Sequence, residues 1–454
     1  MSSENDRRAT SDWSSRASHS QIINDKYIQE FLKQCRLPSR PKTDPLKTKE
    51  FVHAIDGCDL GEKHILTVDG SYTLVSVQKK FPSSQLAFFQ FGAILFTTKD
   101  LENLSAIPFI SPEDMNKLHN LQRIKLVLPV KNITSSGQES LSESIRKAVY
   151  DFFRKEVSSG ISLIETLAWL VFELYKTSPA DEYILSSNPN FNSAPGPVSL
   201  ARSRMKSDYT FEDNDHGKIY LTDVFRLHEV IDEDFGATGI LGYVSRLVEQ
   251  IILLRYLKII FSARPSALRD FMFITNGPLS FSGPTANMHK LVRKLCNHLL
   301  EDKNLYLFGV EKEGPFFEHA LTICREDKEG KGEFHLAKGQ CLILSNQYIY
   351  NYITPGNPEV MHYGSTSYYG GKVIVHTDDG QVFVISIPIS NADIIKSPTI
   401  SDYKNLNEIT GVLKLLKCEM YKDSIVPVAI ANKLISLANH PSKSILESFA
   451  RELL

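Results

Sequence analysis

Residues 64–72 read HILTVDGSY, and this stretch decides how the first part of the chain folds. Ile65 to Val68 form a short apolar run rich in β-branched residues, which predicts a strand inside a sheet. Asp69 ends that run, and Gly70 provides the permissive backbone of a turn. We therefore expect a turn at Asp69 and Gly70, followed by a second strand from Tyr72 to Val77.

A third strand is expected where apolar residues recur between Gln85 and Phe96. A carboxylate at the end of a buried first strand, followed by two hairpin-connected strands, is how metal-dependent nucleases of the RNase H type begin. The alternative interpretation of Asp69 is an aspartate that opens a type I turn, which is a common arrangement. Both interpretations are open for this stretch taken alone.

The whole chain has 454 residues, a formal net charge of −2 and six cysteines. Its near-neutral charge excludes a global basic field, so any surface for nucleic acid must be local. The cysteines lie far apart without a CxxC pair, which argues against a zinc finger or a disulfide scaffold and favours the reducing cytoplasm. The polar, Ser-rich start does not resemble a secretory signal. The most apolar helical run, 251–261, contains Arg255 and Lys258, so we do not expect a membrane span.

Two parts are expected along the chain. Residues 1–50 are predicted to be a polar N-terminal segment with one helix at 22–37 and a proline-rich linker. Residues 51–454 are predicted to form one domain. Within it we expect a helical insertion and a mobile or functional loop at about 135–217, because its second half is rich in Ser, Asn, Pro and Asp.

The remaining elements follow from apolar periodicity. Four consecutive apolar residues at 271–274 predict a strand that is buried on both faces. Other expected elements are helices at 239–261, 285–300, 428–437 and 445–454, a strand at 305–310, and a hairpin around Asp379 and Gly380. The expected fold class is α/β, with a mixed sheet core flanked by helices and a strand-rich C-terminal part.

Four positions place polar groups at the ends of buried elements or on apolar faces. Asp69 and Asn276 each follow a buried strand and precede a glycine, Glu249 lies on a partly apolar helix face, and Lys312 follows a strand. Divalent ions prefer oxygen ligands, and two such ions can stabilise both the attacking water and the leaving oxygen of a phosphodiester. A nearby lysine would neutralise the charge that develops on the phosphate.

Each of these residues also has an ordinary structural interpretation. Glu249 would lie at the helix edge, exposed to water or paired with Arg246 or Arg255. Asn276 would form a plain Asn-Gly turn, and Lys312 would be a solvated lysine in a charged turn. The four residues together, in this order along the chain, are more informative than any one of them.

Five segments together resemble the NurA family of DNA-end-processing nucleases. They are 67–72 (TVDGSY), 223–229 (DVFRLHE) with Glu249 in the following helix, 273–279 (FITNGPL), 308–312 (FGVEK) and 368–372 (YYGGK). The likeness covers most of the chain beyond the N-terminal segment. It is carried by the order and spacing of the segments, since no single motif is specific.

The resemblance implies an RNase H-like core and a deoxyribonuclease with 5′–3′ exonuclease and single-strand endonuclease activity. The implied cofactor is Mn²⁺, with Mg²⁺ as the alternative. The implied partners are linear duplex ends, single strands, a second copy of the chain and a HerA-type hexameric ATPase. In the family pattern Asp69, Glu249 and Asn276 hold metal, and Lys312 and Tyr369 support the phosphate. The implied setting is DNA end processing in repair or antiviral defence, in the cytoplasm.

Two residues depart from the family pattern. Asn276 stands where the family usually has an aspartate, so metal affinity should fall because an amide donates only a neutral oxygen. Asn432 stands where the family often has a histidine, for which His440 is a displaced candidate. These departures favour a second hypothesis, a catalytically weakened or inactive DNA-binding subunit that organises the ATPase ring. A third hypothesis, a scaffold with accidental motifs, predicts that Asp69, Glu249 and Asn276 lie far apart.

Overall fold

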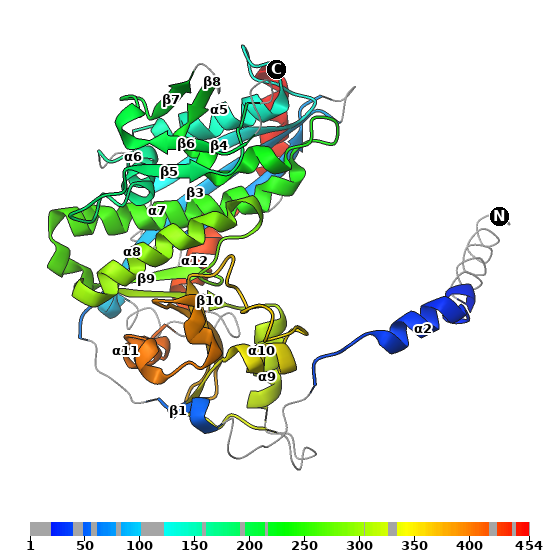
Figure 1. Ribbon diagram of the computed structural model, residues 1–454, viewed down its shortest axis with the longest axis vertical. Helices are drawn as coiled ribbons and strands as arrows, with labels where there is room; N and C mark the ends of the chain where they lie inside the picture. The colour runs from blue at the N-terminus through cyan, green and yellow to red at the C-terminus, as the bar shows by residue number, and fades with distance from the viewer. Residues whose placement is uncertain are drawn as a thin grey trace.

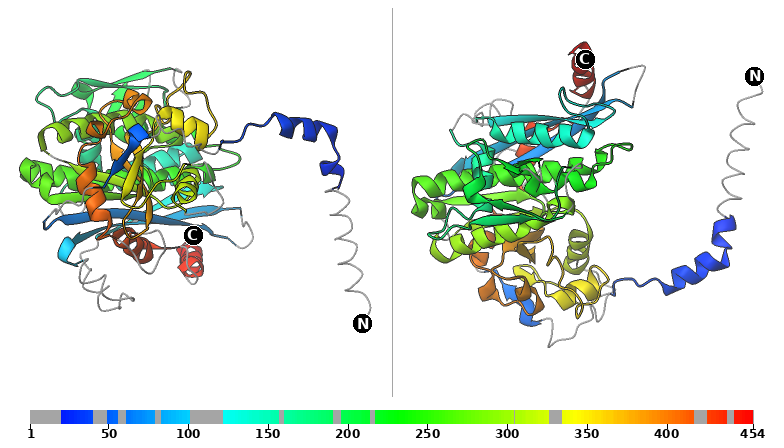
Figure 2. Two further views of the ribbon diagram at one scale, coloured as in Figure 1. Left: turned by 90° about the horizontal axis from the view of Figure 1, so that it is seen from below. Right: turned by 45° about the horizontal axis from the view of Figure 1, so that its top comes forward.

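The computed structural model describes residues 20–39, 49–55, 61–78, 83–100, 122–156, 160–190, 196–213, 217–303, 305–325, 334–416, 425–437 and 442–453. Over these residues the chain forms a large mixed sheet with helices on both sides, as Figure 1 and Figure 2 show. The expected α/β class, with a mixed sheet flanked by helices, is confirmed.

The main sheet has nine strands in the order β1-β11-β12-β13-β10-β9-β2-β3-β4. Their bounds are Val52–Ala54 for β1, His64–Ser76 for β2, Gln85–Thr97 for β3, Gln122–Lys131 for β4, Phe271–Asn276 for β9, Tyr306–Glu311 for β10, Gln340–Ile343 for β11, Gly370–His376 for β12 and Val382–Pro388 for β13.

The direction of the strands divides the sheet into two antiparallel parts joined by a parallel centre. β2, β3 and β4 form an antiparallel meander at one edge. On the other side of β2, β9 and then β10 are added in parallel. β13, β12, β11 and β1 complete the sheet with antiparallel pairs, including the hairpin expected around Asp379 and Gly380.

The expected turn at Asp69 and Gly70 is wrong, because β2 runs unbroken through both residues. Asp69 lies opposite Gly92 of β3, and Gly70 lies opposite Phe91. On its other side β2 pairs with β9 only from His64 to Val68. Asp69 is therefore the first residue of β2 beyond its pairing with β9, and it lies beside Asn276, the last residue of β9.

Within the described residues, α5 to α13 lie around the sheet, and α2 lies apart from it. Figure 2 shows α7 on one side of the β2–β4 strands, and α12 and α13 on the opposite side. The bounds are Lys26–Gln34 for α2, Leu141–Arg154 for α5, Leu163–Val171 for α6, Leu241–Ala263 for α7, Met288–Lys303 for α8, Pro315–Cys324 for α9, Asn346–Tyr352 for α10, Leu406–Leu413 for α11, Val426–Ile435 for α12 and Ser442–Leu453 for α13.

Alternate residues of β2 and β9 enter two separate hydrophobic clusters. Leu66 and Phe273 belong to the cluster that contains the apolar residues of α7. Ile65 and Ile274 belong to the cluster that contains those of α11 and α12. Because strand side chains alternate between the two faces of a sheet, both strands are buried on both faces, as expected for residues 271–274.

The second half of the expected 135–217 insertion and loop contains four short strands. It contains β5 (Glu182–Leu185) paired with β6 (Val198–Ala201), and β7 (Thr210–Asp213) paired with β8 (Gly217–Tyr220). These strands are four residues long, too short to show alternation in the sequence. They are anchored by single apolar side chains, such as Leu200 and Phe211, that reach the hydrophobic core.

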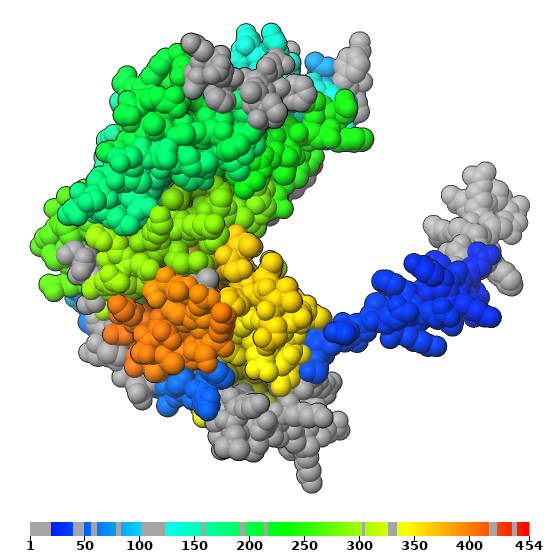
Figure 3. Space-filling model, in the orientation of Figure 1, coloured from blue at the N-terminus to red at the C-terminus, as the bar shows by residue number. Residues whose placement is uncertain are grey.

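The N-terminal helix α2 extends away from the rest of the chain, as Figure 3 shows. The helix expected at 22–37 is divided: residues 20–23 are helical, and α2 begins separately at Lys26, where the side chain of Asp25 accepts a hydrogen bond from the Ile28 N–H and caps it. Beyond α2, the main-chain N–H of Ser39 donates to the carbonyl of Asn351 at the end of α10. In the part of the chain that the structure describes, no helix has the length and apolar character needed to cross a membrane.

Candidate metal centre

Asp69 and Asn276 come from neighbouring parallel strands and meet at the point where β9 ends. The Asn276 amide donates to Asp69 Oδ1 at 3.4 Å. Asp69 is 4 % exposed, so its carboxylate lies inside the protein. Alternate residues of a strand lie on the same face of the sheet. Asp69 therefore shares its face with Ile65, and Asn276 shares its face with Ile274, both of which pack in the cluster that contains α12. The position of β9 beside β2 thus brings together two polar groups that are distant in sequence.

Glu249 approaches the same place from helix α7 on the other face of the sheet. A Cβ atom built on Gly70 would lie 2.8 Å from Glu249 Oε1 and 2.6 Å from Phe91 Cδ1. Only a glycine leaves room for the carboxylate at this point of β2, which explains Gly70 without a turn. Glu249 is itself buried, and Ser245 Oγ donates to its Oε1 at 3.2 Å.

Arg246 is the residue of this centre that the sequence alone did not single out as functional. Its Nη1 lies 3.4 Å from Glu249 Oε2, which confirms the pairing with Arg246 considered above. The same guanidinium donates to the main-chain carbonyls of Asn276 and, at 2.5 Å, Pro278. Arg246 therefore joins helix α7 to the loop that follows β9. The only signal in the sequence was its position three residues before Glu249.

Burial dominates the electrostatics of the two carboxyl groups. It raises the pKa of Glu249 to about 8, with the nearby charge of Arg246 lowering it and that of Asp69 raising it. Burial also raises the pKa of Asp69 above its ordinary value. The hydrogen bond from Asn276 and the positive charges of Lys312 and Arg246 oppose that rise. Two buried acids thus lie close enough to interact, and a cation between them would relieve the cost of ionising both.

Lys312 and Tyr369 occupy different positions relative to this centre. Lys312 directly follows β10 and is partly exposed, and its charge acts on Asp69. Tyr369 is buried, and its hydroxyl donates to Gln250 Oε1 at 2.8 Å. The structure therefore brings the charge of Lys312 near Asp69, whereas the Tyr369 hydroxyl is held by Gln250, the residue next to Glu249. Their support of a phosphate stays a prediction.

A buried ion pair lies beside the centre on β10 and β12. Lys372 Nζ donates to Glu311 Oε1, and both side chains are almost completely covered. Ser386 Oγ also donates to that carboxylate oxygen at 3.3 Å, and Lys372 Nζ lies 4.1 Å from the centre of the Phe316 ring. Glu311 and Lys372 therefore satisfy each other, so the 368–372 segment contributes a structural pair next to the candidate centre.

The donor atoms fit a hard divalent cation. Among the described residues, no three His, Cys, Asp or Glu side chains are grouped to hold a metal ion. Asp69 and Glu249 nevertheless supply carboxylate oxygens, and rotating the Asn276 amide by half a turn would place its oxygen where the nitrogen now meets Asp69. Such oxygen donors suit Mn²⁺ or Mg²⁺ better than softer metals.

The C-terminal family position is only partly described. Asn432 lies exposed on α12, the helix whose last residue, Ile435, accepts a hydrogen bond from Ser71 Oγ at 2.5 Å. Ser71 lies two residues beyond Asp69 on β2, so its side chain is on the same face of the sheet. Helix α12 is thereby fixed near the centre. His440 lies outside the described residues.

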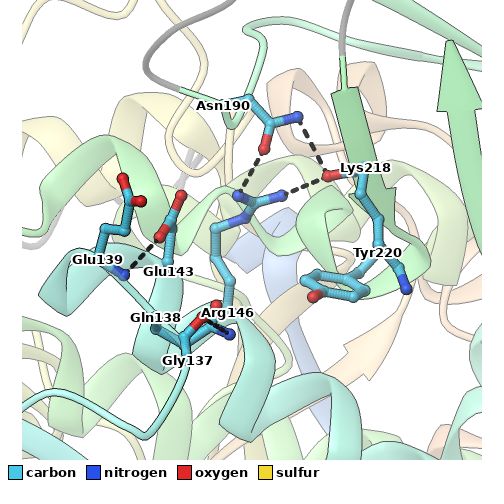
Figure 4. A pocket seen from close by; sticks show the side chains of 8 residues that line it. All are labelled: Gly137, Gln138, Glu139, Glu143, Arg146, Asn190, Lys218 and Tyr220. Carbon is cyan, nitrogen blue, oxygen red and sulfur yellow. Dashed lines mark hydrogen bonds between the residues drawn. The ribbon is translucent and has the colours of Figure 1, made fainter.

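Figure 4 shows a separate pocket of about 380 Å³ that none of these residues lines. Arg146 projects into it and donates to Asn190 Oδ1 at 3.0 Å. The same guanidinium donates to both carboxylate oxygens of Asp223 at 2.8 Å. Because Asp223 neutralises Arg146, the Arg146 guanidinium is not available to bind an anion in this pocket. Asp223 of the 223–229 segment therefore has a structural role.

Comparison with known proteins yields two solved structures. No protein-family model matches the chain, and no curated protein matches it. A NurA nuclease from Sulfolobus solfataricus is 10 % identical over 96 % of this chain and 96 % of that one, with a TM-score of 0.32. A second NurA structure is 10 % identical over 100 % of this chain and 98 % of that one, with a TM-score of 0.26. At these scores neither likeness bears on the fold or the activity.

Proposed function

We propose that the chain is a metal-dependent DNA nuclease whose centre is formed by Asp69, Glu249 and Asn276. The observation that supports the proposal is that the Asn276 amide contacts Asp69, while the Glu249 carboxylate packs from α7 against Gly70, the residue after Asp69. The charges of Arg246 and Lys312 act on the same Asp69 carboxyl group. A scaffold with accidental motifs would leave the three residues apart. Buried carboxylates that gather at the end of a strand without a structural reason are more typical of a site.

The proposal includes an RNase H-like core. It is supported by the strand order, in which β2 starts an antiparallel meander on one side and has parallel strands on the other. The acidic residue lies in the middle of that first strand, at the end of its parallel neighbour. A helix that covers the sheet, α7, supplies the second carboxylate.

The residues have distinct roles in this proposal. Asp69, Glu249 and the amide oxygen of Asn276 would hold Mn²⁺ or Mg²⁺, which when bound would activate a water and polarise the phosphate. Lys312, which follows β10 and whose charge acts on Asp69, would neutralise charge that develops on the phosphate oxygens. Arg246 would keep the Asn276 side of the centre in place through its bonds to the following loop.

The substrate and the partners come from the sequence resemblance. We propose DNA as the substrate, cleaved from linear ends by 5′–3′ exonuclease action and within single strands. The proposed partners are a second copy of the chain and a HerA-type hexameric ATPase. The proposed setting is DNA end processing in repair or in antiviral defence.

A second candidate function is a DNA-binding subunit with weakened chemistry. Two observations favour it. Asn276 brings no charge to the centre, and Arg246 brings a positive charge to Glu249 that a metal ion would have to tolerate. Both features would lower the affinity for a divalent ion without changing the fold.

The test is cleavage of end-labelled linear duplex and single-stranded DNA with Mn²⁺, with Mg²⁺ and with EDTA. We expect metal-dependent cleavage that is lost in Asp69→Asn. The control is Asp181→Asn, which removes a carboxylate whose side chain is 94 % exposed. Stronger cleavage by Asn276→Asp would favour the weakened form of the enzyme. Equal cleavage by the natural chain and Asp69→Asn, or no cleavage by any form including Asn276→Asp, would contradict the proposal.

A further inference from the structure

We propose that this centre binds a single divalent cation and that the guanidinium of Arg246 replaces a second one. The inference rests on the proposed function and deepens it, because it assigns to this chain a metal content and a residue that sets it. It concerns the protein's own side chains, so it can be tested by metal binding without any DNA substrate.

The guanidinium of Arg246 fills a group of three oxygen atoms. It contacts one carboxylate oxygen of Glu249 and the main-chain carbonyls of Asn276 and Pro278. A carboxylate oxygen together with two backbone carbonyls is a typical ligand set for a hard cation. The Arg246 side chain is 19 % exposed, so the guanidinium lies within this nest of oxygens and not in solvent.

The charges of the side chains around Asp69 also favour a single metal ion. Asp69 and Glu249 supply two negative charges when ionised, and Arg246 and Lys312 supply two positive charges that act on Asp69. When both carboxyl groups are ionised, as coordination of a metal ion requires, the four groups balance one another. One divalent ion is the most that such a centre can accept without a large repulsion, whereas a pair of ions would add four positive charges.

The oxygen atoms that Arg246 does not contact are sufficient for one metal ion. The Asp69 carboxylate and the Asn276 amide are 3.4 Å apart at the end of β9, and Oε1 of Glu249 lies against Gly70, the residue after Asp69. Two carboxylates and a neutral oxygen, completed by waters, are sufficient for one Mg²⁺ or Mn²⁺ ion. The neutral Asn276 side chain agrees with this, since an aspartate there would supply the extra charge that a second ion needs.

The test is Mn²⁺ binding to the purified chain, measured by the loss of the electron paramagnetic resonance signal of free Mn²⁺. We expect one ion per chain for the natural protein and a second ion for Arg246→Gln, which keeps an amide donor but loses the charge. The first ion should also bind more tightly to Arg246→Gln, by on the order of tenfold, because a nearby positive charge is gone. Arg246→Lys keeps the charge and should bind one ion.

Circular dichroism and the unfolding transition show whether each variant is folded. Two ions on the natural chain, or one ion on a folded Arg246→Gln, would overturn the inference and leave the proposed nuclease centre intact. No binding to the natural chain at millimolar Mn²⁺ would overturn the inference and the proposed function together. If Arg246→Gln does not fold, the number of ions bound by the natural chain and by Arg246→Lys still tests the inference. Two ions on either protein would refute the idea that Arg246 takes the place of a second ion.

Discussion

Replacing Glu249 by glutamine should stabilise the metal-free protein, and the gain should grow with pH. Burial raises the pKa of this carboxyl from its ordinary 4.5 to about 8. Between these two values the folded chain retains a proton that the unfolded chain has released. Stability therefore falls as pH rises through this window, because the unfolded state binds fewer protons than the folded state. Glutamine has the same shape and cannot ionise, so it removes this contribution.

The magnitude follows from the size of the pKa shift. One pKa unit corresponds to about 1.4 kcal/mol, so the contribution of Glu249 changes by roughly that amount for each pH unit inside the window. Between about pH 5.5 and pH 7.5 the stability of Glu249→Gln relative to the natural chain should thus rise by up to about 2.7 kcal/mol. Coupling to the neighbouring Asp69 carboxyl makes this an upper bound.

The assay is urea unfolding in EDTA at several pH values across that range, with the natural chain and Glu249→Gln side by side. Other groups that titrate contribute equally to both proteins and cancel in the difference. Glu301→Gln, at an exposed position of α8, controls for the loss of a negative charge. A difference between Glu249→Gln and the natural chain that stays constant with pH would refute the burial of an ionisable Glu249.

Three further changes test neighbouring parts of the account. Gly70→Ala should lose roughly 1–3 kcal/mol of unfolding free energy, because its Cβ would overlap Phe91 and the Glu249 carboxylate, whereas Gly242→Ala has open space and should be neutral or stabilising in the same thermal unfolding assay. Lys372→Met should cost about 3–5 kcal/mol in urea unfolding because it leaves the buried Glu311 carboxylate unpaired, and Glu311→Gln in the same chain should recover much of the loss. Asn276→Asp should bind Mn²⁺ more tightly, by on the order of tenfold in calorimetry, because it adds a negative charge beside Asp69. Unchanged stability of Gly70→Ala would contradict the contact between Gly70 and Glu249. No recovery by Glu311→Gln would contradict the Glu311–Lys372 pair, and unchanged affinity of Asn276→Asp would contradict the place of Asn276 beside Asp69.

The strands were the most predictable part of the fold. The runs that became β3, β9 and β10 are strongly apolar, and such runs have few other places than the interior of a sheet. The Asp69–Gly70 turn was wrongly predicted because an Asp-Gly pair has the same local pattern in a turn and in a strand. What distinguishes them is a tertiary contact, the Glu249 carboxylate against Gly70.

The candidate centre was predictable to a similar degree. Asp69 and Asn276 attract attention in the sequence because each ends a buried run. The structure places them in contact with each other, and it places the Glu249 carboxylate against Gly70, the residue after Asp69. Arg246 was not predictable as part of the centre. An arginine three residues before a glutamate reads as an ordinary helical ion pair, and its bonds to the loop after β9 depend on how α7 lies across the sheet.

Lys372 shows the same limit of sequence reasoning. Within an alternating strand it reads as a residue exposed to solvent, yet every residue of β12 and β13 is buried. Its partner Glu311 lies 61 residues earlier in the chain, on β10, so only the assembled sheet reveals the pair.

The central claim is that Asp69, Glu249 and Asn276 form one cation centre. The most direct measurement is X-ray diffraction from crystals of the protein soaked in Mn²⁺, with data collected to locate the metal by its anomalous scattering. The account predicts one peak at coordination distance from oxygens of Asp69 and Glu249, with Arg246 still bound to the Asn276 carbonyl. A structure with Mn²⁺ bound elsewhere, or with no peak between Asp69 and Glu249 at saturating Mn²⁺, would contradict it.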